Sequence, residues 1–144
     1  MTLNDDTPGE KALVRGLYDT LYESKEFDAI GEFYAPDAVR HGGLQGSLEG
    51  GDAIQGYLSA SLGGLSEIEI TELHCLREGS QVAFDFRMAA THSGELLNAP
   101  ATGNRFEIDN GVFFEIEDGL VVDEWPRTDM LGLLEGIELV DLPL

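Results

Sequence analysis

Three carboxylates surround the chain's only tryptophan in the segment Asp-Glu-Trp-Pro-Arg-Thr-Asp, residues 123–129. These residue types allow three interpretations: solvated surface charges, a helix cap, or groups that carry protons in an active site. A carboxylate held against a tryptophan wall in an apolar cavity has its charged form disfavoured, which raises its pKa. Such a group can remove a proton from carbon and return it. The segment is therefore the first candidate for chemistry in this sequence.

Strand alternation and helix capping give the acids of this segment different roles. The regular alternation of a strand places five residues on a common face: Val121, Asp123, Trp125, Arg127 and Asp129. A bulge at Pro126 would shift that register. Asp129 also directly precedes an apolar helical pattern, so it could be an ordinary helix cap or pair with Arg127. Glu124 falls on the opposite face, where we expect it to be solvated or paired with a neighbouring strand rather than catalytic.

Two further polar side chains point toward the predicted interior. In the predicted strand 105–117, Asn110 is the single polar group on an otherwise apolar face. In the predicted strand 81–92, His92 ends an apolar row, whereas Arg87 lies on the opposite face. Polar groups converging on an apolar interior indicate a ligand pocket, whose apolar walls would include Phe84, Phe86 and Phe114. The alternative is that His92 caps a strand end and Asn110 bonds a neighbouring backbone group.

The remaining histidines and the cysteine are weaker candidates for catalytic or metal-binding residues. His41, in the segment Val-Arg-His-Gly-Gly, could look into the mouth of the cavity, and His74 is assigned no role. No pair of histidines has the spacing of a metal site, so we do not expect a metal centre. Cys75 is the only cysteine, and we expect it to be a buried, inert thiol. Nucleotide-binding and serine-hydrolase motifs are absent from the sequence.

The spacing of apolar residues along the chain predicts helices first and strands afterwards. Thr7–Glu10 reads as a capping box before a helix with Leu13, Leu17 and Leu21 on one side. A short second helix covers about 27–34, and a third runs from about 52 to 62. From Leu65 the apolar period becomes two, which predicts strands over 66–77, 81–92, 105–117 and 120–128, before a last short helix over 129–136.

This order of elements predicts an α+β domain in which a curved, mostly antiparallel sheet wraps around N-terminal helices and encloses an apolar pocket. The 144 residues form one domain, with a core of about 10–137. The acidic start does not resemble a secretory signal, and no apolar run is long enough to span a membrane, so we expect a cytoplasmic protein.

The net charge of −20, from 28 acids against eight lysines and arginines, is the unusual feature of the composition. Binding to nucleic acid or to an anionic membrane depends on basic residues, so neither partner is expected. The acids could form the coat of a halophilic protein or an acidic interaction surface. Because they are spread along the whole chain rather than gathered in a tail, the coat is favoured.

Three segments resemble the SnoaL-like polyketide cyclases, a family of the nuclear-transport-factor-2-like superfamily of cone-shaped α+β domains. They are the sequences FYAPDAVRHGG, THSGELLNAPATG and FEIEDGLVVDEWPRTDMLGLL, and the resemblance spans about residues 10–137. It implies that Asp129 is a general acid/base, that His92 contacts a substrate oxygen, and that His41 is a second polar group of the pocket. Ala101 departs from the proline that is usual in the family.

The resemblance implies an intramolecular aldol condensation that needs no cofactor and no metal, on a small apolar carbonyl compound. An isomerase or an epoxide-hydrolase-like enzyme would use the same cavity, although among the arginines only Arg87 and Arg127 offer themselves for the latter, and Arg87 is expected to point outward. A non-catalytic domain that binds a small molecule is the other interpretation. Members of the superfamily commonly dimerise through the outer sheet face, where Phe113 would lie.

Overall fold

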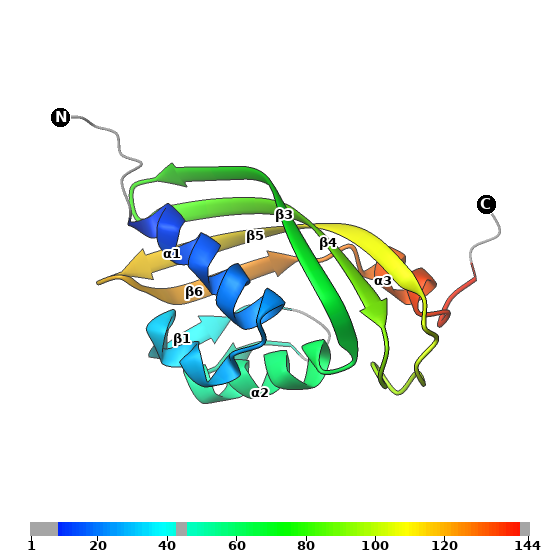
Figure 1. Ribbon diagram of the computed structural model, residues 1–144. Helices are drawn as coiled ribbons and strands as arrows, with labels where there is room; N and C mark the ends of the chain where they lie inside the picture. Colours follow the sequence, from blue (N-terminus) through cyan, green and yellow to red (C-terminus); the bar gives the residue numbers. More distant parts are fainter. Residues whose placement is uncertain (1–8, 43–45, 142–144) are drawn as a thin grey trace.

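The computed structural model describes residues 9–42 and 46–141, which form one curved six-stranded sheet with helices against one face (Figure 1). The strand order is β2-β1-β6-β5-β4-β3. The helices are α1 (Glu10–Leu17), which continues as the π-helical η1 (Tyr18–Glu23), the 3₁₀ helix η2 (Phe27–Glu32), α2 (Gly51–Leu62) and α3 (Met130–Gly136). The strands are β1 (Tyr34–Arg40), β2 (Leu48–Glu49), β3 (Leu65–Glu78), β4 (Gln81–His92), β5 (Arg105–Glu117) and β6 (Leu120–Arg127).

The predicted α+β class and the curved, mostly antiparallel sheet are confirmed. Helices α1 and α2 pack on the concave side because each has an apolar stripe: Val14 and Leu17 of α1, and Ile54 and Leu58 of α2, are fully or almost fully buried. Of the predicted capping box, Thr7 lies outside the described residues. No helix in the described part of the chain is both long and apolar enough to cross a membrane.

The long hairpin of β4 and β5 carries most of the concave surface, and its alternation is as predicted. Every second residue is buried, from Val82 to His92 on β4 and from Phe106 to Ile116 on β5. The opposite face of the two strands is exposed or half-buried apart from Ala89, with Phe113 more than half exposed and Arg87 paired with Asp109. A period of two over 12 and 13 residues is enough to specify which side chains face the interior.

The predicted face of Trp125 is wrong, because β6 has a bulge that the alternation rule did not place. Asp123 pairs with Glu115, but Val121 pairs with the next residue of β5, so Val122 is an extra residue. The bulge therefore lies at Val122, not at Pro126. After it, Glu124 and Pro126 face the interior, whereas Trp125 lies on the outer face.

The pairing of β1 with β6 is parallel, and it joins strands far apart in the sequence. Arg40 lies directly opposite Glu124 in this register, and Val39 lies opposite Asp123. Since neighbouring strands keep their side-chain faces aligned, Arg40 and Glu124 both point to the concave side. This one pairing brings a positive and a negative charge into the interior.

Candidate active site

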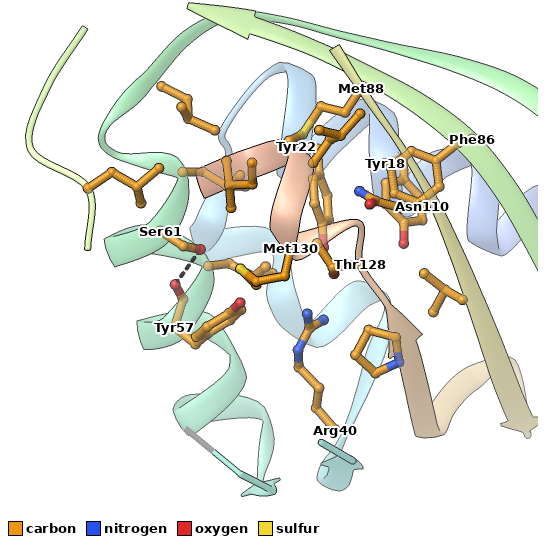
Figure 2. A pocket seen from close by; sticks show the side chains of 18 residues that line it. Tyr18, Tyr22, Arg40, Tyr57, Ser61, Phe86, Met88, Asn110, Thr128 and Met130 are labelled. Atoms are coloured by element: carbon orange, nitrogen blue, oxygen red, sulfur yellow. Dashed lines mark hydrogen bonds between the residues drawn. The ribbon is translucent and has the colours of Figure 1, made fainter. Parts of the chain in front are cut away.

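The candidate site is a pocket between η1, α2, α3 and the concave face of the sheet (Figure 2). Its volume is about 90 Å³, smaller than the cavity of about 150 Å³ that accepts benzene in an engineered protein core. Its walls are mostly apolar, and its polar members are Tyr18, Tyr22, Arg40, Tyr57, Ser61, Asn110 and Thr128. An apolar pocket with a few converging polar groups is the usual form of a small-molecule site.

A buried ion pair underlies one end of the pocket. Arg40 is 7% exposed and its Nη1 donates to Oε2 of Glu124 over 2.6 Å, while Glu124 is fully buried. The hydroxyl of Tyr34 donates to Oε1 of Glu124, also over 2.6 Å. The expectation that Glu124 is solvated is therefore wrong, and the alternative that it pairs with a neighbouring strand is confirmed. Both carboxylate oxygens are occupied, which satisfies a charge that could not be buried alone.

The guanidinium of Arg40 is held in place by more than its ion pair. It lies over the ring of Tyr57, with Cζ 4.8 Å from the ring centroid. Burial lowers the pKa of Arg40, but Glu124 and the neighbouring tyrosine hydroxyls raise it above its ordinary value, so the group stays charged. Arg40 is thus a fixed cation in the wall of the pocket.

Two buried tyrosines lie beside this cation. Burial is the main cause that raises the pKa of Tyr18 and of Tyr22 above the ordinary value, so both hydroxyls remain protonated donors at neutral pH. The Tyr22 hydroxyl lies close enough to raise the pKa of Tyr18 further. Even so, the Tyr18 hydroxyl has no satisfactory hydrogen-bond partner among the described residues.

Asp129 caps α3 at the rim of the pocket. Its Oδ1 accepts a hydrogen bond from the Gly132 amide over 3.0 Å, and its side chain is exposed rather than part of the pocket wall. Its backbone N–H donates to Oδ1 of Asn110 over 3.0 Å, and Asn110 does line the pocket. The residues on either side, Thr128 and Met130, line it too. The chain therefore holds Asp129 next to the pocket, with its carboxylate directed to the helix end.

His92 is buried away from the pocket wall. Its Nδ1 accepts from the Thr102 amide over 3.3 Å and lies 3.0 Å from the Thr102 hydroxyl oxygen, so the ring proton is on Nε2. Nε2 is buried without a partner among the described residues. These contacts tie the loop before β5 to the end of β4. The structure thus does not bring His92 and Asp129 together in one pocket.

The other predicted site residues divide between the pocket, the core and the outer surface. Asn110 and Phe86 line the pocket, whereas Phe84 and Phe114 pack around the ring of Tyr18 in the core. His41 and Trp125 lie outside it, stacked on each other with ring centroids 4.9 Å apart.

His41 also has a polar contact on the outer face of the sheet. Its Nε2 lies 2.8 Å from Oδ1 of Asp123, which also follows the bulge onto the outer face. The structure therefore gives His41 a partner on the convex side of the sheet rather than in the pocket.

Sequence reasoning missed the strongest polar groups of the pocket, Arg40, Tyr18 and Tyr22. Tyr18 and Tyr22 fit the apolar side of the first predicted helix, and the segment around Arg40 is too short for alternation to predict a strand with certainty of face. Alternation with the fully buried Ala38 was the available signal for Arg40. Glu124 could not be found without knowing the bulge and the parallel partner of β6.

The described residues contain no group of three histidine, cysteine, aspartate or glutamate side chains that could hold a metal ion. The polar groups of the pocket are instead mainly hydrogen-bond donors with one fixed cation. Together with the cone-shaped sheet, they define a class of α+β protein with a small, largely apolar ligand pocket.

Comparison with known proteins refines this class. The family model of the SnoaL-like polyketide cyclases matches residues 12–137. The chain belongs to this family, as the sequence segments suggested. No match to a curated protein sequence was found.

Solved structures show the same fold. A protein from Jannaschia sp. CCS1 described as a SnoaL-like polyketide cyclase is 18% identical, with a TM-score of 0.84 over 97% of this chain and 100% of the other. IdmH from Streptomyces antibioticus, described as a polyketide cyclase, is 23% identical, with a TM-score of 0.76 over 90% and 98%. An epoxide hydrolase of M. tuberculosis is 16% identical, with a TM-score of 0.71 over 94% and 93%. At these identities the likeness concerns the fold.

Proposed function

We propose that this protein is a cofactor-independent enzyme that performs acid/base chemistry on a small, mostly apolar carbonyl compound, as a cyclase or a related isomerase. The observation that carries the proposal is the pocket itself. It combines apolar walls, a fixed cation and tyrosine donors with an aspartate held at its rim by Asn110. Family membership favours a catalytic role over simple binding.

Asp129 is the proposed acid/base. Its two neighbours line the pocket, so a rotation of its side chain away from the Gly132 amide would bring the carboxylate to the pocket mouth. The carboxylate would take a proton from the carbon next to a carbonyl group, leaving an enolate. In a cyclisation the enolate carbon bonds to a second carbonyl carbon, and the resulting alkoxide receives a proton. Helix capping in the resting state and proton transfer in the complex are compatible roles.

Two roles compete for His92, which does not line the pocket in the resting protein. The resemblance implies that it contacts substrate oxygen, and its buried Nε2–H is a donor without a described partner. Its contacts with Thr102 also hold the loop before β5, so a structural role accounts for the same side chain. Substitution by asparagine or glutamine, with turnover and unfolding measured together, separates these roles.

The pocket volume limits what can enter it. Since it is smaller than a benzene-sized cavity, only one end of a larger substrate fits. A broader depression between α2, residues 95–98 and α3 shares Tyr57, Ser61 and Met130 with the pocket. We expect the reacting end of the substrate in the pocket and its remainder in this depression.

The proposal is tested by proton exchange at carbon, because that step does not require the natural substrate. Small ketones and 1,3-dicarbonyl compounds are incubated with the protein in D₂O, and the loss of the α-proton signal is followed by NMR. Exchange above the buffer rate is expected for the wild type and not for Asp129→Asn or Asp129→Ser, both of which keep a capping side chain. Binding without exchange in the wild type would instead identify a non-catalytic binding domain.

Epoxide opening is a second candidate, favoured by the acid–arginine pair beneath the pocket. Arg40 supplies the deep arginine that such a site needs, whereas Arg87 and Arg127, the candidates from the sequence, are exposed. However, both oxygens of Glu124 are occupied, so activating water there would require it to release Tyr34 or Arg40. Small epoxides in the same panel, assayed for diol formation, test this alternative.

Dimerisation through the outer sheet face remains part of the proposal. Phe113 is 54% exposed on that face and lines a surface depression with Trp125. Exposed aromatic residues favour self-association. The acids around them oppose it, so we expect the interface to be modest or to depend on salt.

A further inference from the structure

The inner end of the pocket presents hydrogen-bond donors for which the protein supplies too few acceptors. Arg40 and the hydroxyls of Tyr18 and Tyr22 face the same space from β1 and η1 (Figure 2). The acidic partner of Arg40, Glu124, lies behind it and is fully buried. The side chains that a ligand meets here are therefore mainly donors.

Tyr18 is the clearest sign that an acceptor is missing. Its side chain is 1% exposed, and its hydroxyl is buried without a satisfactory partner among the described residues. A buried polar group left without a partner destabilises the fold, and phenylalanine would fill the same space. Its ring is held by Phe84 and Phe86, with centroids 4.8 and 4.7 Å away, so the hydroxyl cannot readily swing out to solvent.

The charge balance of this site suits an oxygen that gains charge during a reaction. Arg40 and Glu124 form a neutral pair before a ligand enters. A neutral carbonyl oxygen can bind there without adding an unbalanced charge to the interior. When the carbonyl becomes an enolate, the donors are already oriented toward the negative oxygen, which is the arrangement that lowers a reaction barrier.

We propose that Arg40, Tyr18 and Tyr22 form the site that binds the substrate's carbonyl oxygen and stabilises its enolate. This inference rests on the proposed function, in which a base removes the adjacent proton. The substrate is then a compound whose enolisable carbonyl stands at a narrow end, with the larger apolar part directed toward α2 and α3. Glu124 and Tyr34 are positioning residues, since they hold the guanidinium without lining the pocket.

Small phenols test the site without a substrate, because a phenolate presents the same charged oxygen as an enolate. Its ring is too large for the pocket alone and would extend into the depression toward α2 and α3. The probe is 4-nitrophenol at a pH below its own pKa, where the free probe is colourless. A site for oxyanions binds the phenolate and releases the proton to the buffer, so the yellow phenolate absorbance rises as protein is added. We expect Tyr18→Phe to weaken this binding about tenfold or more while keeping or raising the thermal midpoint, because only an unpartnered hydroxyl is removed.

The double variant Arg40→Met/Glu124→Leu removes the cation and its partner together, so the fold is expected to persist while the phenolate signal is lost. A phenolate signal that is absent in the wild type, or unchanged in both variants, overturns the inference. Binding of the neutral phenol alone overturns it as well.

Asp129→Asn separates this inference from the proposed function. It should leave phenolate binding intact, because Asp129 does not line the pocket. If the wild type exchanges ketone protons but does not bind phenolate, the oxyanion site is wrong and the proposed function stands. If phenolate binds but no exchange occurs, the oxyanion-binding site stands and the acid/base proposal is wrong.

Discussion

Replacing Glu124 with leucine should destabilise the protein strongly, because it leaves the buried Arg40 without its anionic partner. Breaking a buried ion pair from one side costs about 3–5 kcal/mol. The Tyr34 hydroxyl also loses its acceptor, since it donates to the same carboxylate. For a domain of this size, each kcal/mol lowers the melting temperature by roughly 2–4 °C, so we expect a fall of about 6–20 °C.

The matched control is the exposed pair of Arg15 and Glu72, whose Nε–Oε1 distance is 2.8 Å. This pair is bidentate, because Nη2 also donates to Oε2 over 2.9 Å, whereas the buried pair has a single contact of 2.6 Å; the side chains of Arg15 and Glu72 are 49% and 36% exposed. Glu72→Gln should therefore cost no more than about 1 kcal/mol. The exposed pair has more direct contacts than the buried one, so a larger loss at Glu124 reflects burial rather than contact geometry.

Chemical denaturation of the single variant, of Arg40→Met/Glu124→Leu and of the control gives the three free energies of unfolding. The double variant should recover most of the loss, because two apolar side chains replace the charges. A loss below about 1 kcal/mol in Glu124→Leu would contradict the reasoning, since an exposed pair would lose as much. A double variant no more stable than the single one would likewise refute it.

Three further predictions follow from the same structure. The free energy of unfolding should fall steeply above about pH 10, by up to about 1.4 kcal/mol per pH unit for each buried tyrosine. The reason is that burial raises the folded-state pKa of Tyr18, Tyr22 and Tyr34 above the unfolded value, so the unfolded chain loses those protons first. Chemical denaturation of the wild type and of Tyr18→Phe at several pH values measures the slope. Gly64→Ala should cost about 1–3 kcal/mol in chemical denaturation, because the added methyl would lie 2.5 Å from the Glu95 carbonyl oxygen, and a neutral effect would refute that contact. Phe113→Glu should convert a wild-type dimer to a monomer in analytical ultracentrifugation. Raising the salt from about 0.1 to about 1 M should stabilise both the fold and the dimer, because it screens the repulsion between the acids. A monomeric wild type whose stability does not change with salt would contradict both expectations.

The sheet hairpins could be predicted from sequence because their signal is local. Period-two alternation over 81–92 and 105–117 matched β4 and β5 at both ends, and the buried face followed from it. The bulge at Val122 could not be placed in the same way. Its position depends on how β6 pairs with β5, and a shift of one residue moves Trp125 and Glu124 to opposite faces.

The polar end of the pocket was beyond sequence reasoning for a related reason. Arg40 and Glu124 are 84 residues apart and meet only because β1 adds to the sheet in parallel beside β6. No local pattern reports which strand pairs with which. Asn110 was accessible because a single polar residue interrupts an apolar row, whereas Tyr18 and Tyr22 fitted the apolar stripe of a helix and gave no such signal.

The most direct test of the central claim, that one pocket holds both the acid/base and the oxyanion-binding groups, is deuterium exchange at the α-carbon of a small ketone in the presence of increasing 4-nitrophenol. We expect the wild type to exchange the proton, and nitrophenol to inhibit competitively at the concentrations where its bound phenolate is seen. Exchange that continues while the pocket is saturated with phenolate would contradict it, as would exchange that persists in Asp129→Asn.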